Sequence, residues 1–579
     1  MRRAGALARG PARASLPRPR LLPAVPLMTV ALLTLPVGAG LLGTTLPAFG
    51  VMPALGRAEP GLEAFRALGA WPGLQAAARL SVTSGLAATV LSLAVTMLIV
   101  ASWSGTRVFA AIRRALAPLL SVPHAAAAFG LAFLIAPSGW AMRALSPWAT
   151  GMERPPDWLI VQDPLGLALI AGLVAKEVPF LLLMSIAALG QTDERRARAV
   201  AAGLGYGREA AWFRTVFPRL YRQIRLPVYV VLAYSMTVVD MAVILGPNTP
   251  PSLSVQIVRW MSDPDLALRL QAAAGAVLQL GLVAAALGVW RAGELAVAAS
   301  GGGWVRSGRR GPRGAWPRAL SLALATLSGG AVLAGLAVLA LWSFAALWSF
   351  PQAFPDALTL RSWARHGPGL ADLLVTTGAI AGLAALIALI LTIGCLEAEE
   401  RYGLRIGRGG LWLLYAPLIV PQVAFLPGLQ AALLWSGAQS GVWAVTAAHL
   451  VFVLPYVFLA LADPWRAWDR RLGIAARSLG AGAEGVLWRV RLPMLLAPLL
   501  TAFAVGFAVS VGQYLPTLLV GGGRVATVTT EAVALAAGGD RRAIAVHALA
   551  QTAAALLPFA LAVLLPRLVW RDRRGMRDD

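Results

Sequence analysis

The chain has 579 residues, of which 58% are hydrophobic and only 13% are charged. A soluble globular protein carries about twice that charged fraction, so the composition excludes an ordinary soluble domain and favours a multi-span membrane protein. The net charge of +24 could suit nucleic acid, but arginine in a membrane protein marks cytoplasmic loops, and we expect no nucleic-acid partner. A single cysteine, Cys395, excludes a disulfide framework and a cysteine metal site.

The first 20 residues are rich in arginine, and we expect them to form a cytoplasmic N-terminus. The apolar run from residue 21 to about 49 follows directly. It is longer than the ~7–15 residues of a signal-peptide core, so it predicts a first transmembrane helix that starts on the cytoplasmic side.

Apolar stretches of about 20 residues recur along the chain and predict six spans in each half. In the first half they lie near 21–49, 78–103, 116–141, 164–188, 226–247 and 270–290. In the second half they lie near 319–345, 373–395, 410–436, 441–463, 495–519 and 545–569. The arginine-dense segments between spans all fall on one side, which the positive-inside rule assigns to the cytoplasm together with the tail 570–579. We therefore predict an all-α polytopic membrane protein with about twelve transmembrane helices.

An even number of spans per half gives the two halves the same orientation in the membrane. The chain is thus predicted to consist of two parallel six-helix repeats, 21–290 and 319–569, related by an axis along the membrane normal. The Gly/Arg-rich stretch 291–318 between them is predicted to be a flexible cytoplasmic linker.

A polar pattern of twenty residues occurs once in each half, on the predicted cytoplasmic side. The pattern AVAAGLGYGREAAWFRTVFP, 199–218, recurs as IAARSLGAGAEGVLWRVRLP, 474–493. The shared residues are Ala201, Leu204, Gly205, Gly207, Glu209, Arg214 and Pro218, which return as Ala476, Leu479, Gly480, Gly482, Glu484, Arg489 and Pro493. We therefore expect two loops, 194–218 and 469–493, to form the same structural motif on one side of the membrane, exposed to water.

These loops resemble the EAA loop of binding-protein-dependent ABC importer permeases. Its spacing is Glu-Ala-Ala, three residues, Gly, nine residues, then Ile-x-Leu-Pro. Residues that fit are Ala475, Ala476, Gly480, Val490, Leu492 and Pro493 and, more loosely, Gly205, Thr215, Phe217 and Pro218. The resemblance covers both halves and implies the type I importer permease fold, in which each loop is a helix-turn-helix that docks on a separate ATPase.

Local chemistry agrees with that role. Alanine before Gly480 favours a short helix, the glycine permits the turn that ends it, and Pro493 suits the start of the next span. The residues to which the resemblance assigns ATPase coupling are Ala201, Gly205, Arg214, Pro218, Ala475, Ala476, Gly480, Arg489, Leu492 and Pro493.

The glutamate that names the loop is absent from both copies, where Ala199 and Ile474 stand instead. Candidate substitutes for it are Glu194, Asp469, Glu209 and Glu484. The chain also lacks a phosphate-binding P-loop, because its only lysine, Lys176, lies between Ala175 and Glu177 in an apolar span. We therefore expect no cofactor on this chain, and ATP and Mg²⁺ to be used by a partner ATPase.

Polar side chains inside the predicted spans are candidates for the translocation path, because intramembrane charges are costly and functional by default. They are Lys176, Glu177, Asp240, His124, Gln422 and Gln513. Lys176 and Glu177 have two readings, a patch on the path or a structural tie, and Asp240 is the expected partner of Lys176. Four histidines are too scattered to suggest a metal site.

The resemblance implies the permease subunit of an ATP-driven importer in a bacterial inner membrane, with two ATPase copies and a periplasmic substrate-binding protein. Two permease units in one chain resemble iron(III)-type and thiamine-type permeases, and the stretches 246–265, 513–517 and 529–533 look closest to the thiamine-transport subgroup. The main alternative is a twelve-span secondary transporter of the major facilitator type, which also has parallel halves. That alternative gives no reason for two matched loops. A membrane-embedded enzyme is disfavoured, because no His/Asp/Glu constellation stands out.

Overall fold

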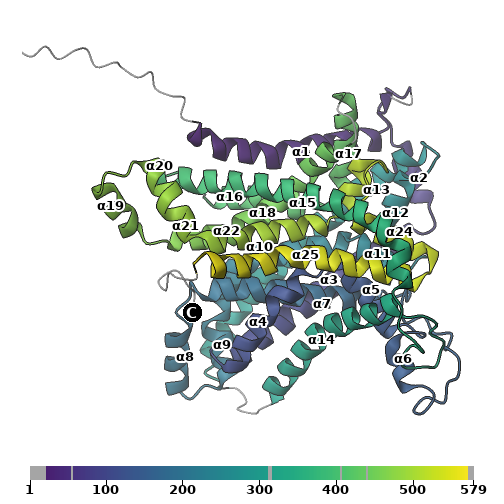
Figure 1. The fold of residues 1–579 in the computed structure, drawn as a ribbon, viewed down its shortest axis with the longest axis horizontal. Coiled ribbons are helices and arrows are strands. Elements are labelled where there is room, and N and C mark those ends of the chain that lie inside the picture. The colour runs from purple at the N-terminus through teal and green to yellow at the C-terminus, as the bar shows by residue number, and fades with distance from the viewer. Residues whose placement is uncertain (1–20, 54–55, 311–315, 405–406, 438–440, 571–579) are drawn as a thin grey trace, which may run out of the picture.

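The computed structural model describes residues 21–53, 56–310, 316–404, 407–437 and 441–570. Over these ranges the chain is helical, with two isolated β-bridges and no strand. The long helices run side by side along the longest axis of the molecule (Figure 1). The basic N-terminus 1–20 and the tail from 571 onward lie outside the described residues.

Each half contains long helices joined by short ones. The helices of the first half are η1 (Leu22–Ala24), α1 (Val25–Ala48), α2 (Glu63–Ala70), α3 (Leu74–Trp103), α4 (Arg107–Ser121), α5 (His124–Ile135), α6 (Trp140–Leu145), α7 (Leu167–Leu189), α8 (Glu194–Gly203), α9 (Arg208–Thr215), α10 (Phe217–Thr237), α11 (Asp240–Leu245), α12 (Leu253–Met261) and α13 (Leu268–Arg306).

The second half repeats this order from α14 onward. Its helices are α14 (Trp316–Phe344), α15 (Arg361–Tyr402), α16 (Arg408–Ile419), α17 (Gln422–Trp435), α18 (Val442–Ala467), α19 (Arg470–Ser478), α20 (Ala483–Val486), the π-helix η3 (Leu487–Arg491), α21 (Leu492–Met494), α22 (Leu496–Val511), α23 (Leu515–Gly521), α24 (Val528–Leu535), η4 (Ala536–Gly538) and α25 (Arg541–Val569).

Nine helices in the described ranges are long and apolar enough to cross a membrane, and two bent helix pairs bring the number to at most eleven. Twelve spans were expected. The expected span near 226–247 is divided between the end of α10 and the short α11. Helix α10 is not apolar enough along its length to be one of these spans, and its first turns carry Arg219, Arg222 and Arg225.

Four of the expected spans are interrupted rather than continuous, which corrects the prediction. The span 116–141 breaks between α4 and α5 at Pro123, and 410–436 breaks between α16 and α17 at Pro421, with an 88° bend. Proline has no N–H to donate and disfavours helical backbone in the residue before it. Two further breaks separate α10 from α11 and α22 from α23.

The linker expected at 291–318 is mostly helical where it is described. Helix α13 continues past the expected span end at 290 to Arg306, and α14 already begins at Trp316. Residues 311–315 lie outside the described part of the chain. A flexible linker over 291–306 was therefore the wrong expectation, since the end of α13 is held by contacts to the loop 194–218 that are described below.

The first long helix of each half packs on the opposite half. Helix α1 lies along α17 and also contacts α15, whereas α14 lies along α5 and also contacts α3 (Figure 1). Contacts within each half remain, because α1 also packs on α13 and α14 on α25. The two repeats are thus interlocked by an exchange of their first helices.

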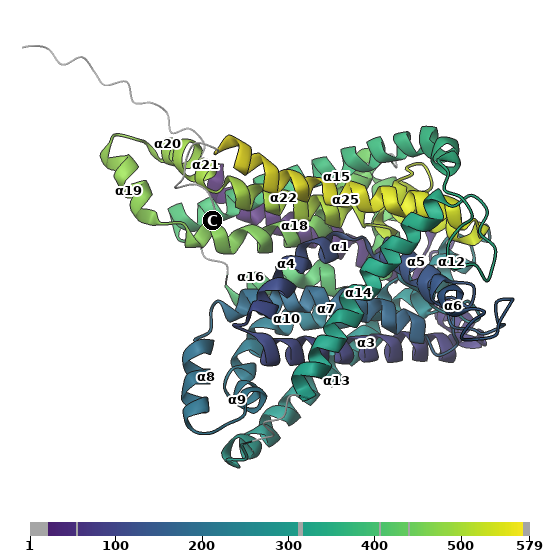
Figure 2. The same cartoon turned by 60° about the horizontal axis from the view of Figure 1, so that its bottom comes forward.

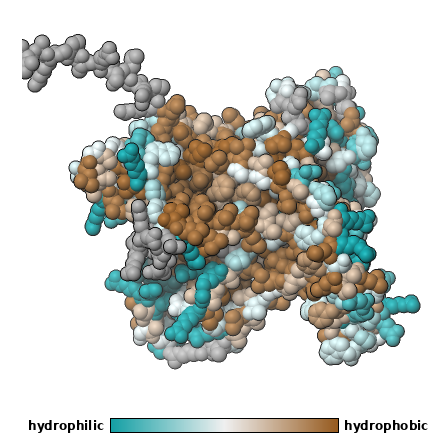
Figure 3. Space-filling view, viewed as in Figure 1, coloured by the Kyte–Doolittle hydropathy of each residue, from teal (hydrophilic) through white to brown (hydrophobic). Residues whose placement is uncertain are grey.

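Apolar side chains cover the middle of the molecule and polar ones its two ends, as the face in Figure 3 shows. Exposed leucines on the outer helices, such as Leu35, Leu327 and Leu561, belong to this apolar band. An apolar band of this kind is what a lipid bilayer solvates. The largest buried cluster lies inside it and draws residues from both halves.

Candidate functional site: coupling loops and translocation path

Both predicted loops fold into a short helix closed by a left-handed glycine. Gly205 follows α8 with φ +80°, and Gly480 follows α19 with φ +87°. The N–H of Tyr206 donates to the Ala201 carbonyl at 3.1 Å, and in the other half Ala481 donates to Ala476 at 3.0 Å. Each bond spans five residues and closes a Schellman motif, for which glycine carries no Cβ penalty. The glycine turn predicted from the sequence is confirmed in both halves.

The two loops lie at the same end of the molecule and form separate projections (Figures 1 and 2). Their tips expose large apolar side chains, since Leu204 is 60% exposed and its counterpart Leu479 is 89% exposed. The described chain also begins and ends at this end, with α1 and α25 (Figure 1). Exposed leucines at matched tips mark a surface suited to a protein partner.

The loop 194–218 is tied to the end of α3 through Ser104. The Ser104 hydroxyl donates to Glu194, and Arg198 donates to the Ser104 carbonyl at 3.0 Å. Arg208 from α9 reaches the same carbonyl at 2.6 Å. Burial is the main reason that the pKa of Arg208 falls to about 10, with the charge of Arg198 adding to the effect. Arg208 still carries its proton at neutral pH and holds both helices of the loop to α3.

Arg214 anchors the same loop to the end of α13. Its guanidinium lies over the Tyr206 ring at 5.0 Å and over the Trp304 ring at 4.4 Å. The N–H of Gly207 donates to the Arg310 carbonyl at 3.0 Å. These contacts explain why α13 extends to Arg306, because its last turns pack on the loop instead of forming a flexible linker.

The loop 469–493 is tied to the end of α15 by a buried ion pair. Arg491 is only 4% exposed, and its guanidinium lies 3.3 Å from Glu397 and also pairs with Glu400. The rings of Trp465 and Trp468 lie over it at 4.3 and 4.7 Å. A buried arginine needs such partners, because an unpaired charge in a dry site is strongly unfavourable.

The sequence reading missed these anchors. Glu400 pairs with Arg491, and Glu399 pairs with Arg466 at 2.8 Å. A signal was available, because a run of carboxylates at the end of one span faces an arginine-rich loop on the same side.

The other predicted coupling residues take different positions. Ala201 is buried, whereas Ala475, Arg489 and Pro218 are exposed. Pro218 begins α10, and Leu492 and Pro493 begin α21, as expected for residues that start the next helix. Ala476 is half-buried at the end of α19. Arg214 and Arg489, matched in sequence, therefore differ, since the first is stacked between rings and the second faces water.

The missing glutamate positions, Ala199 and Ile474, are both exposed on the loops. The candidate substitutes have partners within the chain. Glu194 binds Ser104 and Arg198, Asp469 caps α19, Glu484 pairs with Arg401, and Glu209 lies 3.9 Å from Arg318. Each of these carboxylates thus either caps a helix of its own loop or ties the loop to a neighbouring helix.

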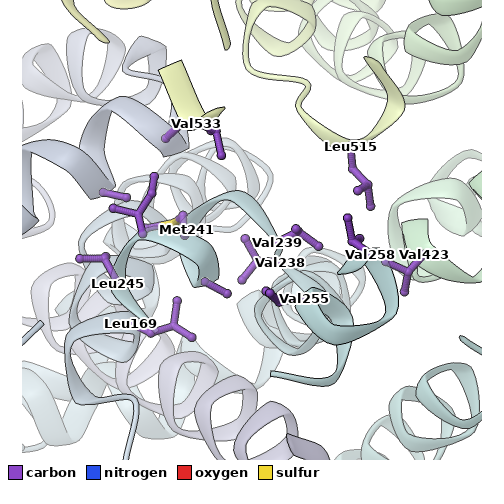
Figure 4. Packing of buried hydrophobic residues seen from close by; sticks show 14 of the residues in the cluster. Leu169, Val238, Val239, Met241, Leu245, Val255, Val258, Val423, Leu515 and Val533 are labelled. Atoms are coloured by element: carbon purple, nitrogen blue, oxygen red, sulfur yellow. The ribbon is translucent and has the colours of Figure 1, made fainter. Parts of the chain in front are cut away.

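The four helix breaks lie in the middle of the bundle and follow the internal symmetry. Helix α11 packs on α5 and α7, and α23 packs on α17 and α18. Figure 4 shows Val239, Leu515 and Val423, each beside a break, in the same core. Polar candidates adjoin all four breaks, since His124 and Gln422 begin helices, Asp240 begins α11 and Gln513 precedes α23. Discontinuous helices near the midplane are where transporters bind their substrates.

Lys176 is a structural tie between α7 and a helix end. Its ammonium group donates to the carbonyls of Leu119 and Val122 at 3.0 and 2.6 Å. These carbonyls are left without helical partners where α4 stops before Pro123. The expected pairing with Asp240 was wrong, because no such ion pair forms among the described residues.

Glu177 lies on the same helix but meets different groups. Its carboxylate is 3.9 Å from the His124 imidazole, whose ring centroid lies 5.0 Å from that of Tyr234. Asp240 is 7% exposed and begins α11, which packs on α5, the helix that His124 begins. The structure therefore places Glu177 beside His124 and near α11. Lys176 is within electrostatic range of Glu177, but its hydrogen bonds go to the carbonyls of Leu119 and Val122.

The second half contributes aromatic and amide groups to this region. Tyr456 on α18 lies with its ring 6.5 Å from that of Phe180, and Tyr514 stands between α22 and α23. Gln422 and Gln513 are half-buried. The tyrosines were missed from the sequence, although Tyr514 sits beside a break and tyrosine is scarce, with only 8 in the chain.

Comparison with known proteins agrees with this geometry. A family described as "Binding-protein-dependent transport system inner membrane component" matches residues 390–570. The inner membrane ABC transporter permease protein YnjC of Escherichia coli (strain K12) is 31% identical over 526 residues, 89% of this chain and 93% of the relative. The spermidine/putrescine transport system permease protein PotC of Haemophilus influenzae is 27% identical over 143 residues, 25% of this chain and 56% of that protein.

The similarity to YnjC extends through both halves, as the matched loops and breaks do. Neither comparison supports the major-facilitator alternative. The relatives are transport subunits and not enzymes. This chain therefore belongs to the binding-protein-dependent ABC transporter permeases, a family of multi-pass inner membrane proteins that work with an ATPase and a substrate-binding protein.

Proposed function

We propose that this chain forms the translocation path of an ATP-driven importer and is driven by a separate ATPase through the loops 194–218 and 469–493. The observation that supports this most directly is the pair of glycine-capped helices, α8 and α19, projecting at the same end of the molecule. Both loops are anchored to helices of the path, so a force on either loop reaches the spans.

Two ATPase copies dock on these loops, one under Gly205 and one under Gly480. The exposed apolar residues Leu204, Leu479 and Ile474 supply the contact surface. This end is cytoplasmic, with both chain termini on the same side. The opposite end, where α2, α6, α12 and α24 lie, faces the periplasm and receives the substrate-binding protein (Figure 1). ATP and Mg²⁺ are bound by the ATPase and not by this chain.

The substrate of the importer is a small solute, with thiamine or a related compound and iron(III) as the first candidates. The thiamine proposal is supported by the resemblance of the stretches 246–265, 513–517 and 529–533 to thiamine-type permeases. PotC, a relative over part of the chain, is named for spermidine and putrescine, so a polyamine is a further candidate.

The test is purification of the tagged chain from its native membrane in mild detergent, followed by mass spectrometry of the proteins that accompany it. We expect an ABC ATPase at a ratio of two per chain. Leu204→Arg or Leu479→Arg alone should halve that ratio, and the double variant should abolish it. Trp148→Arg, at a residue 77% exposed at the opposite end, is the matched control. A chain recovered without an ATPase, with uptake driven by an ion gradient, would overturn the proposal.

A further inference from the structure

The ionisable groups inside the bundle are not balanced against one another. The ammonium group of Lys176 donates hydrogen bonds to the carbonyls of Leu119 and Val122, and so it stabilises the C-terminal end of α4. Glu177 and Asp240 are 5% and 7% exposed. Both carboxylates thus lie inside the membrane region, and His124 is near Glu177. Lys176 is within electrostatic range of Glu177, but neither carboxylate forms an ion pair with Lys176 or with an arginine among the described residues.

The contact of Glu177 with His124 is weak. At 3.9 Å the two groups are too far apart for a hydrogen bond, and the His124 side chain is 35% exposed. Burying a carboxylate without a close hydrogen-bond or ion-pair partner costs folding free energy. Such a group inside a membrane usually has a functional role, such as binding a ligand. Glu177 is directed at His124, and His124 stands at the break between α4 and α5.

Aromatic rings from both halves lie near the helices that carry these carboxylates. The Tyr234 ring lies 5.0 Å from that of His124 in the first half. From the second half, the Tyr456 ring lies 6.5 Å from that of Phe180, on the same helix as Glu177, and Tyr514 stands at the break before α23. All three tyrosines are half-buried, so part of each ring remains accessible. A ring face attracts a cation, and this attraction is larger where water is excluded.

We propose that Glu177, Asp240 and the rings of Tyr234, Tyr456 and Tyr514 form a binding site for a small organic cation on its way through the membrane. This deepens the proposed function and rests on it, since it names the substrate class for the same path. A permanently charged or protonated nitrogen meets both features of the site, because carboxylates neutralise its charge and aromatic faces replace its water. An anionic solute meets neither.

The charges of this site come from one half only. The positions of the second half that correspond to Lys176 and Glu177 hold Phe452 and Val453, both buried among apolar side chains. The second half adds rings and amides instead. The cation is therefore held against the first half, with Tyr456 and Tyr514 closing on it from the other side.

The experiment measures how the local field selects a charged reagent, and it requires no knowledge of the natural substrate. Gln513→Cys is introduced into full-length chain carrying Cys395→Ser, and the protein is reconstituted in lipid nanodiscs. Labelling rates are measured for two methanethiosulfonates of similar size, one with a trimethylammonium group and one with a sulfonate. Leu358→Cys, at a residue 67% exposed on a loop, gives the reference ratio of the two rates.

Relative to that reference, we expect the cationic reagent to be favoured at 513 on the order of ten-fold, because clefts of one charge concentrate counter-ions. Glu177→Gln and Asp240→Asn, which keep the side-chain shape, should each reduce the preference, and together they should remove it. A ratio equal to the reference, a preference for the sulfonate, or a cysteine that neither reagent reaches would overturn the proposal.

This readout separates the two proposals. If the cation preference appears but no ATPase accompanies the chain, the ATP-driven mechanism fails and the cation site stands. If an ATPase accompanies both the parent chain and the Glu177→Gln variant but the preference is missing, the importer proposal stands and the substrate class fails.

Discussion

Gly130 on α5 and Gly335 on α14 approach each other so closely that neither has room for a side chain. A Cβ added to Gly335 would lie 2.7 Å from the carbonyl carbon of Gly130, and one added to Gly130 would lie 2.8 Å from that of Gly335. The symmetry repeats this contact between α1 and α17, where a Cβ on Gly43 would lie 2.6 Å from the Gly428 oxygen. Small residues that let helix backbones touch are the usual basis of helix packing in membranes. The exchanged first helices are thus held by backbone contact.

Gly335→Ala should loosen this exchange. Overpacking of a tight contact costs typically about 1–3 kcal/mol, because backbone has to move. We expect a lower unfolding temperature of the purified chain in detergent. Gly330→Ala, on the same helix with nothing within 4 Å of the added Cβ, is the control and should leave that temperature unchanged or raise it slightly. Equal effects of the two substitutions would contradict the contact.

Gly480→Val should uncouple transport while the protein still inserts into the membrane. The position has φ +87°, where a residue with a side chain is strained by roughly 1–2 kcal/mol. The turn after α19 then loses its shape, and we expect ATP hydrolysis by the complex to lose its dependence on substrate. Gly482→Val adds the same side chain two residues later, where φ is −69°, and should retain coupling. Substrate-dependent hydrolysis in the Gly480 variant would argue against the coupling role.

Arg491→Gln should be among the most damaging single changes at the cytoplasmic end. Without Arg491 the buried Glu397 keeps only Arg401 as a partner and Glu400 loses its own. Breaking a buried ion pair costs up to about 3–5 kcal/mol. Denaturant unfolding of the single variants and of the pair with Glu397→Gln should show strong coupling between the two sites. Arg489→Gln, two residues away and exposed, should change stability by less than about 0.5 kcal/mol. Additive effects of Arg491 and Glu397 would refute the pair.

Lys176→Met should destabilise the chain by about 1–3 kcal/mol, because the carbonyls of Leu119 and Val122 lose their donor. Since Lys176 acts on a helix end and not on Asp240, a double-mutant cycle with Asp240→Asn should give a coupling energy near zero. Thermal unfolding of the four proteins in the same detergent measures it. A coupling energy above about 0.5 kcal/mol would show that Lys176 and Asp240 do interact, and would contradict the assignment of Lys176 to the helix end.

The helix breaks were only partly visible in the sequence. Pro123 and Pro421 marked two of them, yet the expected spans ran through both. The residues on either side of each break are mostly apolar, so the mean hydropathy of the stretch does not fall at the break. The breaks after Thr237 and Val511 carry no proline at the interruption itself. They form where helices from both halves converge, and their backbone groups are satisfied by neighbouring helices.

The linker and the anchors show the same limit. Glycine and arginine between 291 and 318 predicted a flexible connection, but packing on the loop 194–218 keeps α13 helical to Arg306. The role of Arg491 likewise depended on Glu397, which lies 94 residues earlier. Tertiary contacts decided both, since propensity and composition describe a segment without its neighbours.

The sequence by itself determined the membrane class, the duplication, and the glycine turns at 205 and 480. These follow from local physics, because apolar length sets a span and a left-handed turn favours glycine. Only the tertiary structure decided which polar groups neutralise each other. It assigned Lys176 to a helix end and placed Glu177 beside His124, because pairing depends on distances that a chain acquires only when it folds.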